Sequence, residues 1–142
     1  MDDLRIRAAR IDEAQAVLDF WALAAEGTSV SDDLAGVRGL IARDPGALLL
    51  AEVGGVLTGT LIAGFDGWRC SLYRLAVHPD LRRRGVAGAL LAAAEERFRE
   101  LGGRRGDAMV LERNEVAHRA WRAAGYERED HWRRWVKSLA GG

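Results

Sequence analysis

The sequence predicts a single α/β domain over residues 1–142, with a mixed, mostly antiparallel sheet of six to seven strands flanked by about four helices. Two β-rich runs, 47–53 and 56–65, are joined by Gly54-Gly55, a strong signal for a tight hairpin. Strand–helix–strand units follow, and this order favours helices on both faces of the sheet. Hydrophobic residues make up 49% of the 142 residues, enough for one packed core, and no linker or repeat divides the chain.

The N-terminal part predicts one strand and two helices. Residues 4–9 alternate as a strand does, and an acidic start at Asp12 leads into apolar residues at helical spacing. The helix is interrupted at Gly27-Thr28-Ser29. Ser31 then has the side chain of a helix N-cap, and Pro45-Gly46 ends the second helix.

The middle of the chain predicts a strand followed by a long helix. After a turn at Asp66-Gly67, residues 70–77 have the composition of a strand. A loop at 78–85 leads into a helix that extends to Leu101, because apolar side chains recur at i, i+3, i+4 and i+7, and Gly102-Gly103 ends it. These apolar positions are Ala87, Leu90, Leu91, Ala94, Phe98 and Leu101.

The C-terminal part predicts one further helix and two or three short strands. Residues 108–111 form the first of these strands, and 114–124 form the helix, which Gly125 ends. Residues 126–129 and 132–139 predict one or two final strands.

Two tryptophans belong to the last of these segments. Core packing explains Trp132 and Trp135 best. A sheet edge that pairs with a second copy in a homodimer is the alternative, and the sequence leaves the oligomeric state open.

Charge and cysteine content exclude several classes of protein. The 21 basic and 21 acidic residues cancel, so no global field attracts nucleic acid or an anionic membrane, and we expect neither partner. Cys70 is the only cysteine, which excludes a disulfide-stapled secreted fold. No apolar run approaches the roughly 20 residues of a membrane span, and the N-terminus does not resemble a signal peptide. We therefore expect a cytoplasmic protein.

The segment 75–88 carries the strongest functional signal. An apolar strand runs through a turn at Pro79-Asp80 into a helix that opens with small residues. Unpaired N–H groups at a helix start, with the helix dipole behind them, form an anion site. Gly85 removes a side chain where a pyrophosphate must approach the backbone, and Ala87 and Gly88 keep the first turn thin.

Three arginines precede this glycine and can add charge-assisted bonds to phosphate oxygens: Arg82, Arg83 and Arg84. A solvent-facing helix start remains the alternative interpretation. The phosphate loop of nucleoside triphosphatases needs Lys-Ser or Lys-Thr after its final glycine, and this chain has neither there. A dinucleotide fingerprint needs three spaced glycines near the start of its domain, whereas Gly85 and Gly88 lie in mid-chain.

Together these motifs resemble the GNAT superfamily of N-acetyltransferases. The family signature, Arg/Gln-x-x-Gly-x-Gly/Ala, is filled by Arg82, Gly85 and Ala87, and residues 75–79 are similar to the family's strand-to-loop segment. The resemblance spans about 47–126. A second block stands at the family's Asn-x-x-Ala and Gly-aromatic positions: Asn114, Ala117, Gly125 and Tyr126.

The resemblance implies the GNAT-like acyl-CoA N-acyltransferase fold and transfer of an acetyl group from acetyl-CoA to a primary amine of a small molecule or protein. The amine attacks directly, so neither a metal nor a covalent enzyme intermediate is required. A splay between the strands 70–77 and 108–111, with a bulge near 75–77, would hold the pantetheine arm as an added strand. An N–H near Ala76 would polarise the thioester.

The expected cofactor contacts come from the strand, the loop and the C-terminal helix. They are Leu75, Ala76, Val77, Arg82, Arg83, Arg84, Gly85, Val86, Ala87, Gly88, Asn114 and Trp121.

The catalytic residues are the weakest part of the match. Trp121 stands where many relatives carry a tyrosine that protonates the thiolate, and an indole N–H is not a practical proton source. We expect the ring of Trp121 to contact the pantetheine arm with its flat face or to pack in the core. By strand alternation Ser71, Tyr73 and Leu75 share the face that borders the acceptor.

Tyr73 is therefore a candidate acid or substrate contact, and Glu112 is a second candidate. A water chain could instead deprotonate the amine. Without a clear acid or base, a non-catalytic acyl-CoA-binding or sensing module is the alternative function. Three acids flank the junction of the first two helices and could attract a cationic amine, although acids are common at helix ends: Glu26, Asp32 and Asp33.

Overall fold

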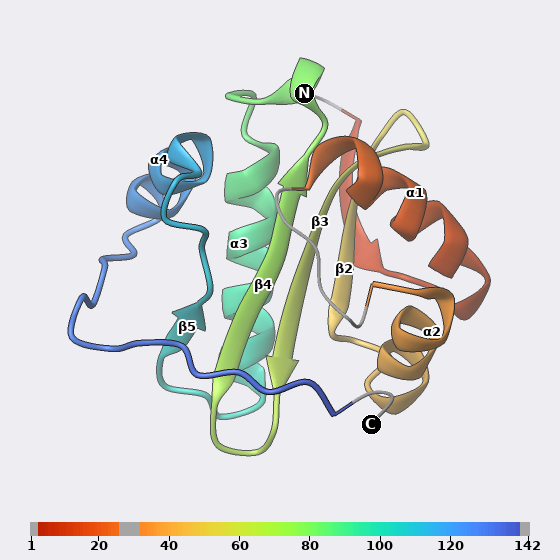
Figure 1. Cartoon of the computed structure of the whole chain (residues 1–142). Helices are drawn as coiled ribbons and strands as arrows, with labels where there is room; N and C mark the ends of the chain where they lie inside the picture. Colours follow the sequence, from red (N-terminus) through yellow and green to blue (C-terminus); the bar gives the residue numbers. More distant parts are fainter. Residues whose placement is uncertain (1–2, 26–31, 140–142) are drawn as a thin grey trace.

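A computed structural model describes residues 3–25 and 32–139 of the chain. Within them lie a five-stranded sheet in the order β1-β2-β3-β4-β5 and four α-helices (Figure 1). The strands are β1 (Leu4–Ala8), β2 (Leu48–Val53), β3 (Val56–Phe65), β4 (Cys70–Val77) and β5 (Gly106–Ala108). The helices are α1 (Ala14–Ala24), α2 (Leu34–Arg43), α3 (Val86–Glu100) and α4 (Glu115–Ala123), with 3₁₀ turns at Ile11–Glu13 and Pro79–Leu81.

The first four strands form an antiparallel meander, and β5 joins β4 in parallel. The β2–β3 hairpin turns at Gly54 and Gly55, whose φ angles of 59° and 81° suit a tight hairpin turn and favour glycine. The mostly antiparallel, mixed sheet and the four helices are as the sequence predicts. Within the described residues, the sheet has five strands rather than six or seven.

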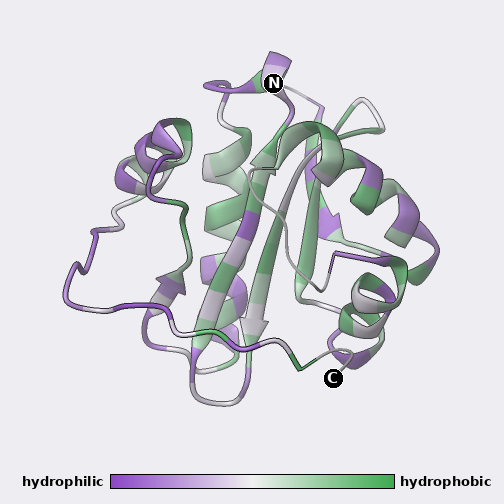
Figure 2. Ribbon diagram, viewed as in Figure 1, coloured by the Kyte–Doolittle hydropathy of each residue, from purple (hydrophilic) through white to green (hydrophobic). Residues whose placement is uncertain are grey.

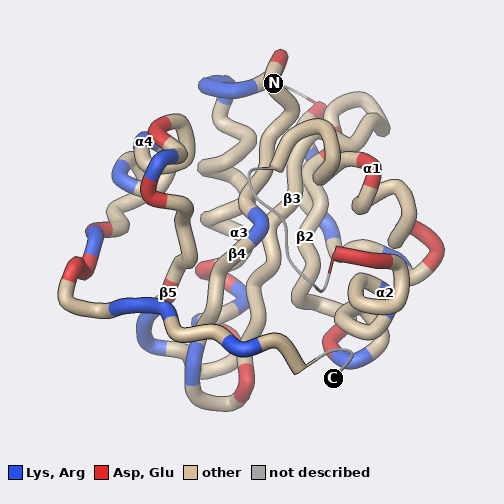
Figure 3. Tube along the Cα trace, in the orientation of Figure 1, with Lys and Arg blue, Asp and Glu red and all other residues tan. Residues whose placement is uncertain are grey.

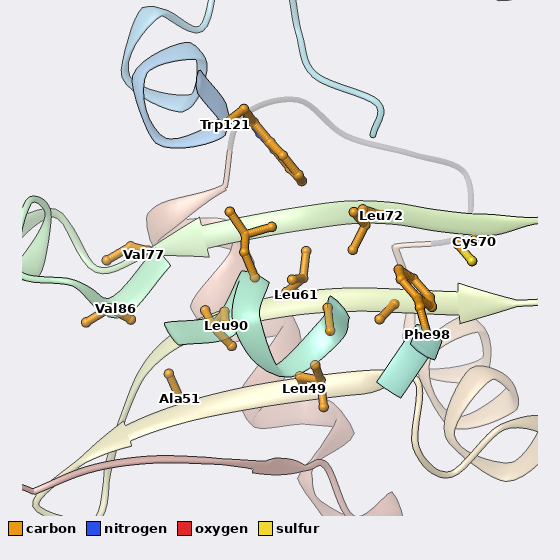
Figure 4. Close-up of a cluster of buried hydrophobic side chains, with 13 residues drawn as sticks. Leu49, Ala51, Leu61, Cys70, Leu72, Val77, Val86, Leu90, Phe98 and Trp121 are labelled. Atoms are coloured by element: carbon orange, nitrogen blue, oxygen red, sulfur yellow. The ribbon is translucent and has the colours of Figure 1, made fainter. Parts of the chain in front are cut away.

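The sheet is buried on both faces because α1 and α2 cover one side and α3 covers the other (Figure 1). Alternate residues of β2 therefore enter different clusters: Leu48 and Leu50 pack with α1 and α2, while Leu49 and Ala51 pack against α3. This explains why β2 is hydrophobic along almost its whole length (Figure 2). Trp121 of α4 closes the α3-side cluster (Figure 4).

The segment after α4 departs from the sequence prediction. Residues 126–139 carry no helix or strand, and Trp132 and Trp135 are 64% and 92% exposed rather than packed in the core. These tryptophans are three residues apart, so a strand would place them on opposite faces, and five charged or histidine residues precede Trp132. The strand predicted at 108–111 lies instead at Gly106–Ala108.

The N-cap of α2 is Asp33, whose carboxylate accepts a hydrogen bond from the N–H of Gly36 at 2.7 Å. Ser31, the predicted N-cap, lies outside the described residues, as do the break at 27–29 and Glu26.

Gly59 of β3 sets how closely α3 approaches the sheet. A β-carbon at this position would lie 2.9 Å from Cγ1 of Val86 and 3.2 Å from the carbonyl oxygen of Ala76. We expect Gly59→Ala to destabilise the protein by about 1–3 kcal/mol through overpacking. Gly39→Ala is the control, because this exposed helical glycine has no neighbour within 4 Å of an added β-carbon and alanine should stabilise α2 by up to about 1 kcal/mol. Urea unfolding midpoints test both, and a Gly59→Ala protein as stable as the parent would contradict this packing.

Candidate active site

One edge of β4 is open over its C-terminal half. β4 pairs with β5 only through Cys70, Ser71 and Leu72, because β5 ends at Ala108. β4 itself continues to Val77, so no strand of the described residues pairs with this edge at 73–77 (Figure 1). We call this unpaired backbone edge of β4, residues 73–77, the β4 notch.

A bulge lies at the start of this notch. Ile62 pairs with Tyr73 and Thr60 with Ala76, so β4 uses one residue more than β3 over the same span. Arg74 lies within it and has a φ of 57°. The family resemblance implies a bulge near 75–77, and the register shift overlaps that range at Leu75.

The extra residue corrects one prediction about side chains. Ser71, Tyr73 and Leu75 were expected to share a face by strict alternation. Leu75 instead packs in the α3-side cluster with Leu72, while Ala76 packs with α1 and α2. One inserted residue reverses the alternation of every side chain after it, which is why the prediction fails at Leu75.

Backbone groups of β4 also take defined directions. The N–H of His78 donates to the carbonyl of Thr58 on β3 at 2.9 Å. Because backbone groups alternate along a strand, the N–H of Ala76 also faces β3, and that of Val77 faces the notch. The carbonyl of Arg74 accepts from the Thr60 hydroxyl at 2.9 Å, so the N–H of Leu75, which points the opposite way across the planar trans peptide, faces the notch.

The loop 82–88 follows directly from the end of β4. Arg83 and Gly85 have left-handed φ angles of 65° and 87°, and Gly85 is the N-cap of α3. The first hydrogen bond of the helix runs from the N–H of Ala89 to the carbonyl of Gly85. The three N–H groups before it, from Val86 to Gly88, therefore have no partner within the helix. A β-carbon on Gly85 or Gly88 would meet no atom within 4 Å, so the loop faces open space there.

The three arginines of the loop do not act alike. Arg82 turns inward, with Nε 3.3 Å from the carbonyl oxygen of Val77 and Nη2 3.5 Å from that of Ala24. Arg82 thereby connects the end of β4 to the end of α1. Arg83 and Arg84 are exposed, and they form the basic stretch at this loop in Figure 3.

Helix α4 supplies the remaining predicted contacts. The side-chain oxygen of Asn114 caps α4 by accepting from the N–H of Ala117 at 3.1 Å. Trp121 is 5% exposed, reaches from α4 toward β4 near Leu72 (Figure 4), and meets the ring of Tyr126 edge-on at 5.0 Å. Trp121 is thus a core residue whose ring points toward β4.

The two proton-handling candidates lie in different surroundings. Tyr73 is 39% exposed, and burial together with the nearby charge of Asp44 raises the pKa of its phenol. Glu112 lies on the surface and pairs with Arg128 at 3.0 Å. The structure therefore gives Tyr73 the environment of a neutral donor and engages Glu112 in an exposed ion pair.

The acids predicted near the acceptor are occupied elsewhere. Asp32 forms an ion pair with Arg74, and Asp33 caps α2. The resulting contact between the α1–α2 junction and the bulge was not predicted, nor was the role of Thr60, a fully buried hydroxyl beside the bulge. Its sequence signal is weak, because Thr60 is one of two threonines in the mainly apolar strand β3.

Within residues 3–25 and 32–139, no group of three or more His, Cys, Asp or Glu side chains could hold a metal ion. No helix of this part of the chain has the length and apolar character needed to cross a membrane.

The acetyltransferase (GNAT) family pattern matches residues 13–126 of the chain. An acetyltransferase of Pectobacterium atrosepticum is 33% identical over 127 residues, covering 89% of this chain and 90% of that protein. The fold is shared with an aminoglycoside 6'-N-acetyltransferase of Acinetobacter baumannii, with a TM-score of 0.75 at 20% identity over 97% of this chain and 99% of that one. A Salmonella typhimurium protein determined with its cofactor acetyl-CoA gives 0.67 at 22% identity, over 88% and 80% of the two chains.

The chain contains two tyrosines, and both phenols are held neutral in the fold. Burial raises the pKa of Tyr73, and burial with the hydrogen bond to Glu95 raises the pKa of Tyr126. We expect phenolate absorbance of the folded protein to appear only above the ordinary pKa of about 10. The same titration of the denatured chain should give lower values, so folding stability falls as pH rises above the unfolded pKa. If the tyrosines of the folded protein titrate at or below the pKa measured for the denatured chain, their pKa values are not raised by the fold.

Proposed function

Because the chain belongs to the acetyltransferase (GNAT) family, we propose that acetyl-CoA binds along the β4 notch and that a primary amine attacks its thioester directly. The observation that carries this proposal is the meeting of two features at one place. The open edge of β4 ends where the loop 82–88 presents unpaired N–H groups. A ligand with an extended amide arm and a pyrophosphate fits both.

The pyrophosphate would lie on the start of α3. The N–H groups of Val86, Ala87 and Gly88 point out of the helix end, and the helix dipole favours an anion there. Arg83 and Arg84 are exposed beside them and can add charge-assisted hydrogen bonds. Arg82, which binds backbone carbonyls, would shape the loop rather than contact phosphate.

The pantetheine arm would pair with β4 as an additional strand. The N–H of Val77 faces the notch and can donate to a carbonyl of the arm, and the N–H of Leu75 can point at the thioester carbonyl. Ala76 would contribute through its position between them. Trp121 would close the α4 side of the arm with an apolar surface, and Asn114 retains side-chain N–H donors beyond its capping bond.

The reaction follows from these contacts. The nitrogen lone pair of the amine attacks the carbonyl carbon, and the negative charge that forms on oxygen is stabilised by the Leu75 N–H. Collapse of this intermediate breaks the carbon–sulfur bond, which gives the amide and the coenzyme thiolate. The proton lost by the amine reaches the thiolate through water, because the hydroxyl of Tyr73 lies beside Gly64, which pairs with Ser71 in the N-terminal half of β4.

The acceptor is a primary amine, and the residues of the site do not select one class of amine. The Acinetobacter relative of the fold acts on aminoglycosides, as its name states. In this chain Asp32 is paired with Arg74 and Asp33 caps a helix, so these two acids do not single out a polycation. A panel of aminoglycosides, amino acids and peptides, with thiol release as the readout, separates the classes. Turnover with any of them decides against a purely binding module.

A homodimer is the assembly we propose. The exposed Trp132 and Trp135 support it, since a second copy would remove their side chains from water.

Gly88→Glu tests the cofactor site. Gly88 has no left-handed φ and no neighbour within 4 Å of an added β-carbon, so the fold should tolerate the change. A carboxylate at the start of α3 repels the pyrophosphate, and we expect acetyl-CoA affinity to fall at least about tenfold in calorimetry. Gly39→Glu adds the same side chain to an exposed glycine of α2 and should leave affinity unchanged. No binding by the parent at millimolar acetyl-CoA, or full binding by Gly88→Glu, would refute the site.

Trp121→Tyr tests the missing general acid. The variant restores a phenol where relatives of the family carry theirs, and the ring of Trp121 already points toward β4 (Figure 4). We expect acetyl-CoA affinity within a few-fold of the parent and faster turnover, an effect for which about 10²-fold is the low end of general-acid catalysis. Trp121→Phe is the matched control because it keeps an aromatic ring without a hydroxyl. A Tyr variant no faster than the Phe variant would show that the phenol does not reach the sulfur.

A further inference from the structure

A buried hydroxyl connects α1 to the bulge of β4. Thr60, at the centre of β3, is fully buried. Its oxygen accepts a hydrogen bond from the indole N–H of Trp21 at 2.9 Å, and its hydroxyl donates to the carbonyl of Arg74 at 2.9 Å. The hydroxyl thus acts as acceptor and donor at once, and its two partners come from segments far apart in the sequence.

The residue that receives this bond has an unfavourable backbone conformation. Arg74 has a φ of 57°, in the left-handed region that a side chain other than glycine's disfavours. Three contacts stabilise Arg74 in this unfavourable conformation. The carbonyl is bound by Thr60, the guanidinium lies 5.2 Å from the centre of the Trp21 ring, and the same guanidinium pairs with Asp32. Trp21 therefore supports the bulge twice, through Thr60 and through the face of its ring.

The direction of the Arg74 carbonyl fixes the direction of the next N–H. Both groups belong to one planar trans peptide, in which C=O and N–H point in opposite directions. Since Thr60 holds the carbonyl from the β3 side, the N–H of Leu75 is held toward the β4 notch. Rotation of this peptide would turn the donor away from the notch without unfolding the strand.

We propose that Thr60 and Trp21 are positioning residues for acetyl transfer: they hold the Arg74–Leu75 peptide so that the Leu75 N–H meets the thioester carbonyl. This inference rests on the proposed binding of acetyl-CoA in the notch. Thr60 touches neither substrate. It acts through the bulge. Its loss should weaken binding of the acetyl group and stabilisation of the transition state, and should leave binding of the pyrophosphate at the loop 82–88 unchanged.

A matched control lies two residues away on the same strand. Thr58 is also buried, and its hydroxyl donates to the carbonyl of Ala51 on β2, on the side away from β4. Thr58→Val and Thr60→Val remove the same hydroxyl from two buried positions of β3, but only the second removes a bond to the bulge of β4. Thr60→Ser is the rescue variant, because it loses a methyl group and keeps the hydroxyl.

The experiment compares acetyl-CoA with CoA. CoA lacks the acetyl group whose carbonyl the Leu75 N–H would bind, so the ratio of the two affinities in calorimetry reports on contacts at the acetyl group and not on the pyrophosphate. We expect Thr60→Val to lose the preference for acetyl-CoA while CoA binds as in the parent. Its kcat with the best amine of the panel should fall at least about tenfold, since removing one oxyanion donor costs more than that in other enzymes. Thr60→Ser and Thr58→Val should keep both the preference and the kcat.

Each other result overturns the inference in a recognisable way. If Thr60→Val keeps the preference and the kcat, the hydroxyl does not position the donor. If Thr58→Val or Thr60→Ser loses as much as Thr60→Val, the effect is one of packing. If the parent itself binds neither acetyl-CoA nor CoA, the proposed function fails and this inference fails with it. If the parent binds both and Thr60→Val has no effect, only the role of Thr60 is refuted, and the proposed function stands.

Discussion

One extra residue in β4 is the constraint on which the proposed site depends. Without it, β4 would pair with β3 in unbroken register, and Leu75 would lie on the α1–α2 face. With it, Arg74 takes a left-handed conformation, the alternation reverses, and the Leu75 N–H is directed away from β3. The conformation is unfavourable for a residue other than glycine. It persists because Thr60, Trp21 and Asp32 surround Arg74 with a hydrogen bond, an aromatic face and a charge.

The second requirement is that the start of α3 meets the end of β4. Gly59 permits this, because α3 packs so closely on β3 there that a β-carbon would collide with Val86. Arg82 holds the same corner from the other side by binding the carbonyls of Val77 and Ala24. An arginine that looks like a phosphate ligand in the sequence therefore binds backbone carbonyls instead, and in the proposed anion site the phosphate would be bound mainly by backbone N–H groups.

The features that the sequence predicts correctly are those with local causes. Gly54-Gly55 specifies a hairpin through its own backbone freedom, and the apolar spacing of 86–100 specifies a helix face whatever the helix packs against. The bulge is different, because the groups that hold Arg74 come from α1, from β3 and from the segment before α2. The spacing of residues along the sequence does not reveal contacts between such distant segments. The face of the sheet on which Leu75 lies was therefore predicted wrongly. The final strands failed because tryptophans three residues apart do not fit one face of a strand.

The chemistry explains why a site with no evident base or acid can still work. A thioester has a fair leaving group, and a neutral amine is already a nucleophile, so the main demands are to hold the two together and to stabilise one developing charge. In the proposed site both demands fall on backbone groups of β4 and of the loop 82–88. On this proposal, transfer does not depend on a side-chain acid or base such as Tyr73 or Trp121. The direction of those backbone groups depends on buried side chains, and Thr60, with its bonds to Trp21 and to the Arg74 carbonyl, is the clearest of them in this chain.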